Sequence, residues 1–172
     1  MKTIYFLIYN GLIYPAIFFS ALIISAFNKK LRQSIKGKFG SINILRNYFN
    51  KIDLNNNIYW FHASSLGEFF QVKTVIEKLK EEQDDLICIV SFSSPSGFNN
   101  ANSDAMDLKF YIPFDFPWTI NRVLREIKPK KIMFASYDLW PNLVWISRLK
   151  GIHVNLYSVK TKKSALKDNQ IS

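Results

Sequence analysis

The stretch that decides the fold is Ile58–Glu68, IYWFHASSLGE, where a hydrophobic run stops at small polar residues, a glycine and one acid. Such a run predicts a buried strand that delivers a carboxylate to the rim of a sheet. Open α/β sheets build their ligand crevices at the carboxyl ends of the strands, because only the loops there can reach a substrate. Glu68 is therefore the first candidate for a functional residue.

On either side of this stretch, apolar runs of strand length alternate with longer amphipathic stretches. Strands are predicted at Ile58–His62, Leu86–Phe92, Lys109–Ile112, Lys131–Ala135 and Ile152–Tyr157. Helices are predicted between them at Phe69–Gln83, Phe98–Ser103, Trp118–Ile127 and Pro141–Lys150. Strands that alternate with helices in this way are typical of βαβ units. The sequence therefore predicts an α/β fold, with a Rossmann-like parallel sheet and helices on both faces.

An apolar segment begins the chain. Ile4–Phe27 contains 24 residues without a charge, and a helix needs roughly 20 such residues to cross a bilayer core. Pro15 would kink this helix, so a crossing helix and a re-entrant or monotopic anchor both stay open. A cleaved signal peptide is disfavoured, because Lys2 alone precedes the segment and the basic cluster follows it. We expect a membrane anchor at 1–27, with Asn28 onward on the cytoplasmic side.

The positive charge of the chain is concentrated directly after the anchor. Residues 28–51 hold seven Lys or Arg side chains and no acid, whereas residues 52–172 hold fifteen basic and thirteen acidic side chains. A nucleic-acid partner is not expected, because its binding needs basic groups spread over a folded face. Residues 28–57 are interpreted as a basic juxtamembrane connector. Its charges either attract anionic lipids of the inner membrane, by about 1 kcal/mol each, or only fix the topology.

Several classes of site lack support in the sequence. Neither GxGxxG nor GxxxxGK[ST] occurs, and HExxH, paired CxxC and acidic clusters with metal spacing are missing too. Cys88 is the only cysteine, and it lies in an apolar run typical of a buried position in a cytosolic protein. His62 and His153 each lie beside a predicted strand, which favours packed residues over ligands. No metal and no cofactor are expected.

The loops after the predicted strands carry the specific signal. SFSSPSG (91–97) follows the second strand and could present backbone N–H groups to an anion or a sugar. YIPFDFP (111–117) follows the third strand, and SYDLWPN (136–142) follows the fourth. Each loop alone is weak evidence, because turns commonly use Ser, Pro, Gly and Asn. The order and spacing of the loops are more informative.

Together with HASSLGE (62–68), the N-terminal anchor and the basic stretch, these loops resemble the N-terminal half of the 3-deoxy-D-manno-octulosonic acid (Kdo) transferases. The similarity extends from about residue 1 to residue 158. This resemblance implies the N-terminal domain of a GT-B glycosyltransferase that binds a lipid A precursor as acceptor, while a C-terminal domain binds the donor CMP-Kdo. The enzyme would act at the cytoplasmic face of a bacterial inner membrane, in lipopolysaccharide biosynthesis.

The resemblance also implies roles for individual residues. An inverting sugar transfer needs a base for the proton of the acceptor hydroxyl, and the resemblance assigns that role to Glu68. The acceptor-binding positions that we carry over are Ser64, Ser65, Gly67, Ser94, Ser96, Gly97 and Asp138. For Gly67, a requirement of the turn geometry is the alternative explanation.

Two departures from the family pattern stand out. Many members have two glutamates in ETELWPN, where this chain has Ser136 and Asp138. Asp138 either compensates for the missing acid or caps the next helix, and Trp140 is expected to be a packing anchor rather than a sugar platform. After Tyr157 the sequence becomes polar.

The chain is therefore divided into an anchor (1–27), a connector (28–57), an acceptor-binding domain (58–158) and a polar tail (159–172), with the donor domain absent. A fragment, a truncated reading frame and half of a split enzyme all stay open. Because catalysis requires both substrates to be held together, this chain alone is expected to be inactive. The alternative hypothesis is a non-catalytic, membrane-bound acceptor-binding or interaction module.

Overall fold

The computed structural model describes residues 2–52 and 57–157 and shows an α/β fold. Five parallel strands form one sheet with the order β3-β2-β1-β4-β5. The strands are β1 (Asn57–Ala63), β2 (Leu86–Phe92), β3 (Leu108–Tyr111), β4 (Lys131–Phe134) and β5 (His153–Leu156). The predicted strands are confirmed, with ends that differ by one or two residues. The predicted tail at 159–172 lies outside the described residues.

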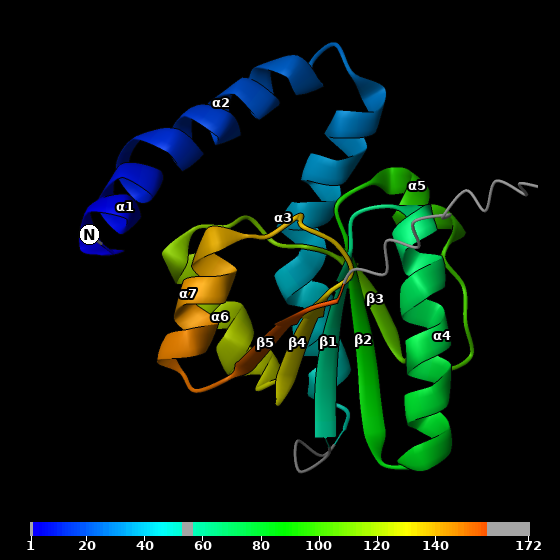
Figure 1. Ribbon diagram of the computed structural model, residues 1–172. Helices are drawn as coiled ribbons and strands as arrows, with labels where there is room; N and C mark the ends of the chain where they lie inside the picture. The colour runs from blue at the N-terminus through cyan, green and yellow to red at the C-terminus, as the bar shows by residue number, and fades with distance from the viewer. Residues whose placement is uncertain (1, 53–56, 158–172) are drawn as a thin grey trace, which may run out of the picture.

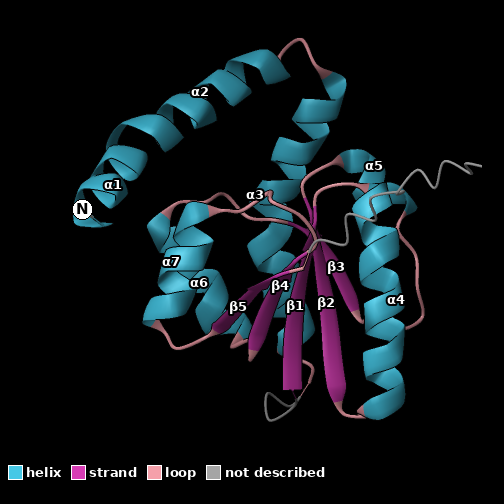
Figure 2. Ribbon diagram, viewed as in Figure 1, coloured by secondary structure: helices cyan, strands magenta, loops and turns pink. Residues whose placement is uncertain are grey.

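Helices cover both faces of the sheet (Figures 1 and 2). One face packs against α3 (Lys29–Phe49), α6 (Pro117–Ile127) and α7 (Pro141–Leu149). The other face packs against α4 (Leu66–Glu82) and α5 (Pro95–Asn100). Strand β1 is buried on both faces, because Trp60 contributes to the first core and Phe61 to the second. This explains why its sequence is a continuous apolar run instead of an alternating one.

Two helices begin earlier than the sequence predicted, because serines cap them. The side chain of Ser65 accepts from the Glu68 N–H and starts α4 at Leu66 instead of Phe69. The side chain of Ser94 accepts from the Gly97 N–H and starts α5 at Pro95 instead of Phe98. Both caps satisfy backbone donors that have no partner inside a helix. Glu68 consequently lies in the first turn of a helix and not in a loop.

Most of the predicted connector at 28–57 is helix α3, which the sequence did not predict. Leu45 and Phe49 of α3 are buried in the core beneath the sheet. The hydroxyl of Ser34 donates to the Ser93 carbonyl at 2.8 Å, and that of Ser41 donates to the Tyr111 carbonyl at 2.5 Å. Helix α3 therefore belongs to the folded domain and holds the loops after β2 and β3.

The apolar N-terminal segment is helical throughout its described part. It comprises α1 (Lys2–Ile8), a π-helical turn (Tyr9–Ile13) and α2 (Tyr14–Ser25). The N–H of Tyr14 bonds to the carbonyl of Tyr9, five residues earlier, in the turn just before Pro15. This wider turn makes room for the proline ring, which would clash with a regular helix. Thr3–Ser25 is long and apolar enough to cross a membrane by length and composition, and only 6% of its most apolar window is buried.

Substitutions at two glycines of α3, Gly37 and Gly40, can test how this helix packs on the domain. A methyl group at Gly37 would overlap the ring of the buried Tyr111, whereas a methyl group at Gly40 would meet nothing within 4 Å. We expect Gly37→Ala to destabilise the domain by about 1–3 kcal/mol through overpacking. Gly40→Ala should stabilise it by about 0.5–1 kcal/mol, because alanine favours a helix. Denaturant unfolding of both variants measures the difference, and equal effects would contradict the packing of α3 on Tyr111.

Candidate functional site

The candidate site lies where the strand order reverses, between β1 and its neighbour β4. At such a switch point the loops after the two strands diverge and leave a crevice at the carboxyl edge of the sheet. The β1–α4 turn brings Ser64 and Glu68 to this edge, and the β4–α7 loop brings Ser136 and Asp138. Residues more than sixty positions apart in the sequence thus contact each other here.

Glu68 is partly exposed, and donors from both sides hold its carboxylate. Oε2 accepts from the Ser64 N–H at 2.5 Å, and Oε1 accepts from the Ser136 hydroxyl at 3.0 Å. The N–H of Glu68 itself donates to Ser65 Oγ at 3.3 Å. This exchange resembles a capping box, in which an acid of the first turn bonds back to the residues before its helix. The carboxylate is thereby fixed at the rim and still has lone pairs for a substrate proton.

A second acidic side chain, Asp138, lies beside it among hydroxyl groups. Its Oδ2 accepts from the hydroxyls of Ser64 and, at 3.4 Å, Ser93. Hydrogen bonds from these hydroxyls lower the pKa of Asp138 below its usual value, against the effect of partial burial. Asp138 is therefore ionised at neutral pH. Its side chain bonds within the loop cluster instead of capping α7.

His62 is a buried connector between the strands and the loops. The indole N–H of Trp140 donates to His62 Nε2 at 3.2 Å, which assigns the proton of a neutral ring to Nδ1, facing the Ser91 carbonyl at 3.1 Å. Burial lowers the pKa of His62, although Asp138 acts in the opposite direction. His62 Nε2 lies 3.5 Å from Asp138 Oδ2. Because the imidazole is neutral, this contact is not an ion pair. The expectation of a packed histidine is confirmed for His62 but is wrong for His153, which is exposed at the start of β5.

Helix α3 adds a lysine that the sequence analysis did not single out. The ammonium of Lys38 lies 4.3 Å from the centre of the Trp140 ring and donates to the Ile112 carbonyl at 3.1 Å. Burial lowers the pKa of Lys38 to about 7, against the opposing effects of Asp138 and Asp115. Because Lys38 is one of seven basic residues scattered over residues 28–51, no local pattern distinguishes it. Trp140 therefore packs between polar groups, as expected for an anchor.

The structure places the predicted acceptor-binding residues in different environments. Ser64 and Asp138 contact each other beside Glu68, and Gly67 is exposed on the first turn of α4. Ser65 and Ser94 use their side chains as helix caps. Gly97 is buried, where a methyl group would lie 2.8 Å from Phe92 and 3.2 Å from the Ser65 backbone. Ser96 is exposed on α5.

Gly67 is not required by the turn. A methyl group there would meet only Ser65 Oγ, at 3.9 Å, and the positive-φ glycine of the described residues is Gly151. Packing and backbone geometry therefore both permit a side chain at position 67. The turn-geometry explanation raised by the sequence is wrong for this structure.

Behind the rim, a buried carboxylate holds the β4–α7 loop in place. Asp115, fully buried in the loop after β3, accepts from the N–H groups of Asn142 and Leu143 at 3.0 Å each. These are the second and third residues of α7, whose N-cap residue Trp140 makes no side-chain cap. Asp115 thus caps α7 from another segment of the chain, and an anion at that helix end is favourable. This role of Asp115 was not predicted from the sequence, although its loop carries part of the family pattern.

The N-terminal helix joins this buried network. The hydroxyl of Tyr9 donates to Asp115 Oδ2 at 2.9 Å. The amide of Asn142 donates to Asn10 Oδ1 at 2.7 Å, and the amide of Asn10 donates back to Asn142 Oδ1 at 3.0 Å. We call Tyr9, Asn10, Asp115 and Asn142 the polar latch. It ties the π-helical turn of the apolar helix to the start of α7.

Comparisons with known proteins agree with this geometry. Residues 33–170 match the model of a family described as 3-deoxy-D-manno-octulosonic-acid transferase (kdotransferase). The chain belongs to this family.

Curated relatives include the 3-deoxy-D-manno-octulosonic acid transferase of Aquifex aeolicus, 29% identical over 119 residues that cover 67% of this chain and 33% of that protein. The enzyme of the same name from Haemophilus influenzae is 28% identical over 95 residues, which cover 54% of this chain and 22% of that protein. A bifunctional glycosyltransferase/methyltransferase of Fusobacterium nucleatum is 33% identical over 97 residues, which cover 54% of this chain and 15% of that protein. The chain spans a third or less of the length of these relatives.

The part of the chain at 2–52 and 57–157 holds no group of three or more His, Cys, Asp or Glu side chains arranged to bind a metal.

The buried Asp115 should make stability depend on pH. Burial raises the pKa of Asp115 to about 6 from 3.8, against the bonds from Asn142, Tyr9 and Leu143. Because the folded state holds this proton more tightly than the unfolded state, its contribution is complete below about pH 4 and is lost as pH rises through about 6. Over that window, we expect the unfolding free energy of the wild type to fall relative to Asp115→Asn by up to about 3 kcal/mol. Parallel pH profiles would contradict this position of Asp115.

Proposed function

We propose that this chain is the acceptor-binding half of a membrane-attached Kdo transferase, which transfers Kdo from CMP-Kdo to a lipid A precursor. Membership of the family supports the reaction class, and the names of the relatives support Kdo as the transferred sugar. The observation that carries the proposal for this chain is the Glu68 carboxylate, which is held at the switch point and remains partly exposed. The proposed division is an anchor at 1–27, an acceptor domain that ends near residue 158, and a donor domain on another stretch of polypeptide.

In the proposed inverting reaction, an acceptor hydroxyl attacks the anomeric carbon of Kdo as Glu68 takes its proton. The bond from that carbon to the CMP phosphate breaks, and CMP leaves with the electron pair. The lowered pKa makes Asp138 a weaker base than an ordinary carboxylate, so Glu68 is the proposed base. The charge of Asp138 is instead positioned with Ser64 to bind acceptor hydroxyls. The sugar acceptor would thus meet a base, Glu68, and a carboxylate that accepts hydrogen bonds, Asp138, on the same rim.

Ser136 fits this scheme although many family members have an acid at its position. Its hydroxyl donates to Glu68 at 3.0 Å, and a second carboxylate at that point would repel the first. The hydroxyl therefore holds the base in place without competing for the substrate proton. Activity in this chain does not depend on restoring the acid.

Attachment to the inner membrane, with the domain on the cytoplasmic face, is the proposed location. The apolar helix and the exposed basic side chains at the start of α3 support it. Anionic lipids attract each of these charges by about 1 kcal/mol near the surface. The lipid A precursor would then reach the domain from the same membrane.

The role of Glu68 is tested in an assay that includes the donor half, supplied as the following reading frame or as a separate polypeptide. With CMP-Kdo and a lipid A precursor, Glu68→Gln is expected to lower the rate of Kdo transfer by at least about 100-fold. Glutamine retains an oxygen for the Ser64 N–H, so the cap and the fold should persist. Glu77→Gln, on the same helix, is the matched control. Full activity of Glu68→Gln would refute the assignment.

The same assay separates the enzyme from a non-catalytic module. A module would bind the acidic lipid headgroup but show no turnover with any donor half. Sequencing the DNA downstream of Ser172 is the inexpensive first step, because a donor domain encoded there favours the enzyme. Unrelated sequence there, together with absent turnover, would favour the module.

Gly67 offers a second test of the acceptor side. Because a methyl group fits at position 67 without a clash, Gly67→Ala should leave the unfolding free energy within about 0.5 kcal/mol. If the acceptor approaches the backbone of this turn, the variant should raise KM for the acceptor several-fold. Gly40→Ala, which also meets open space, is the control for a methyl group remote from the rim. An unchanged KM would remove Gly67 from the acceptor site.

A further inference from the structure

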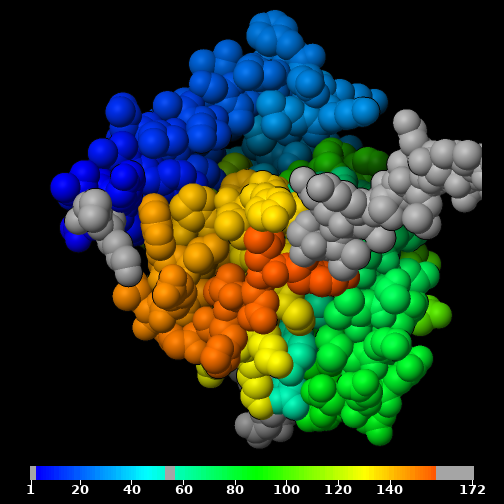
Figure 3. Space-filling view, viewed as in Figure 1, coloured from blue at the N-terminus to red at the C-terminus, as the bar shows by residue number. Residues whose placement is uncertain are grey.

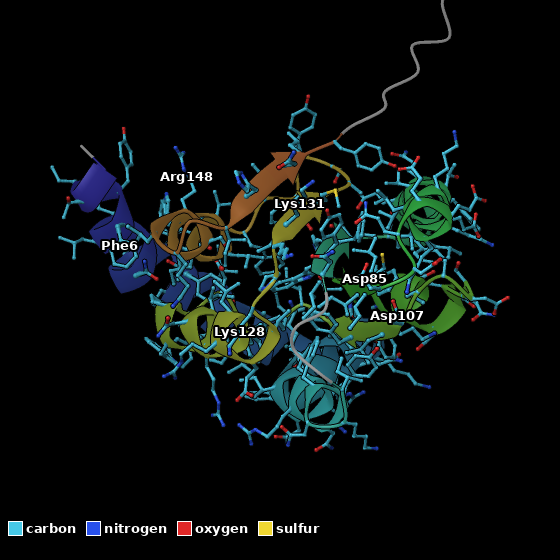
Figure 4. The ribbon with its side chains drawn as sticks, turned by 90° about the horizontal axis from the view of Figure 1, so that it is seen from below. Phe6, Asp85, Asp107, Lys128, Lys131 and Arg148 are labelled. Carbon is cyan, nitrogen blue, oxygen red and sulfur yellow. The ribbon has the colours of Figure 1, made fainter. Side chains whose placement is uncertain are left out.

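The folded domain contacts one face of the apolar helix along much of its length. Figure 3 shows the atoms of α1 and α2 lying against α7 and the neighbouring loops, and the view from below in Figure 4 places Phe6 beside α7. The contacts are Phe6 with Trp145, Tyr9 with Asp115, Asn10 with Asn142, Tyr14 with Phe116, and Phe18 with Phe114. From Phe6 to Phe18 they cover about 18 Å of the helix axis. The domain therefore lies alongside the middle of this helix.

The opposite face of the helix is apolar and uncovered. Its exposed large side chains are Ile4, Tyr5, Leu7, Ile8, Leu12, Ile13, Ile17, Phe19, Ile23 and Ile24. A continuous apolar face of this size indicates a membrane or a partner. The helix thus has one face committed to the domain and one face available to lipid.

These two faces are incompatible with a helix that crosses the bilayer. The hydrocarbon core is about 30 Å thick, so a crossing helix would place residues 6–18 largely inside it. Asp115, Asn142 and the irregular loop after β3 would then enter the lipid with them, and lipid-exposed loop backbone is not tolerated there. A helix that lies in the interface avoids this cost, because only its outer face enters the acyl region.

We propose that the apolar helix lies in the plane of the membrane interface, held to the domain by the polar latch, and that an aromatic ridge beside it forms a second membrane contact. This rests on the membrane attachment proposed above but not on Kdo transfer. It selects the monotopic alternative that the sequence left open.

The aromatic ridge consists of Phe18, Phe39, Phe114, Phe116 and Trp118. Each ring contacts the next one along the ridge. The distances between ring centroids are 4.8 Å for Phe39 and Phe114, 5.1 Å for Phe114 and Phe18, 5.2 Å for Phe18 and Phe116, and 4.7 Å for Phe116 and Trp118. At its two ends, Phe39 of α3 is 62% exposed and Trp118 of α6 is 69% exposed. The ridge continues the apolar surface from the helix onto the domain, and aromatic side chains favour the depth of the lipid headgroups.

The charges near the ridge favour a bilayer over a protein partner. The first two turns of α3 follow the apolar helix and expose Lys29, Lys30, Arg32 and Lys36. Ammonium and guanidinium groups beside an apolar face are typical of interfacial helices on anionic membranes. The occupant of this surface is therefore the anionic leaflet.

The in-plane position is tested with the full chain bound to anionic vesicles. Single cysteines replace Ile4, Leu12 and Ile24 in turn and carry a fluorophore, while the buried Cys88 stays unlabelled. Quenchers attached to lipids at shallow and deep positions then report the depth of each label. An in-plane helix predicts the same shallow depth at all three positions and access to Ile4→Cys from the side of the domain. A deep label at Leu12, with Ile4→Cys reachable only from the opposite side, would overturn the inference.

The second contact is tested by vesicle partitioning. Phe39→Ser and Trp118→Ser should each lower the partition coefficient roughly tenfold, because each removes a large apolar side chain from the interface. Leu149→Ser is the matched control, since Leu149 is 86% exposed on α7 away from the ridge. Equal effects of the three substitutions would remove the ridge from the proposal. If the wild-type chain does not bind vesicles at all, membrane attachment is refuted. The proposed Kdo transfer would still be tested separately by the transfer assay.

Discussion

The carboxylate of Asp115, buried at the start of α7, is the constraint on which the rest of this structure depends. A buried carboxylate costs free energy unless donors surround it, and here the Asn142 and Leu143 N–H groups and the Tyr9 hydroxyl supply them. The two N–H groups belong to the first turn of α7, and the hydroxyl belongs to the apolar helix. One carboxylate thereby fixes the loop after β3, the first turn of α7 and the middle of the apolar helix relative to one another.

The functional rim follows from that constraint. Trp140 directly precedes α7, so the position of this helix determines where the Trp140 side chain lies. The Trp140 indole N–H bonds to His62, and the Trp140 ring packs against the Lys38 ammonium. His62 in turn lies beneath Asp138 and Ser64, and Ser64 also binds Glu68 through its N–H group. The candidate base is thus connected to the buried carboxylate through a continuous series of contacts. Sugar transfer needs such order, because small errors in the position of reacting groups cost large factors in rate.

The sequence predicted the strands and the place of Glu68 because both depend on local information, namely apolar runs and the residues that stop them. It did not predict α3, because seven basic side chains dominate a stretch whose buried residues, such as Leu45 and Phe49, are few. It did not predict the cap by Asp115 either, since that cap joins segments 27 residues apart. Gly67 and Gly97 look alike as loop glycines, and only their three-dimensional neighbours separate an open position from a packed one.

The direction of the sheet relates the membrane surface to the rim. The strands of a parallel sheet all end at one edge, and both the polar latch and the Glu68 carboxylate lie among the loops of that edge. If the apolar helix lies in the interface, as proposed, the same attachment holds the rim close to the lipid headgroups. A headgroup sugar would then reach Glu68 while its acyl chains stay in the leaflet, and extraction of the lipid, which would cost about 0.8 kcal/mol per methylene group exposed to water, becomes unnecessary.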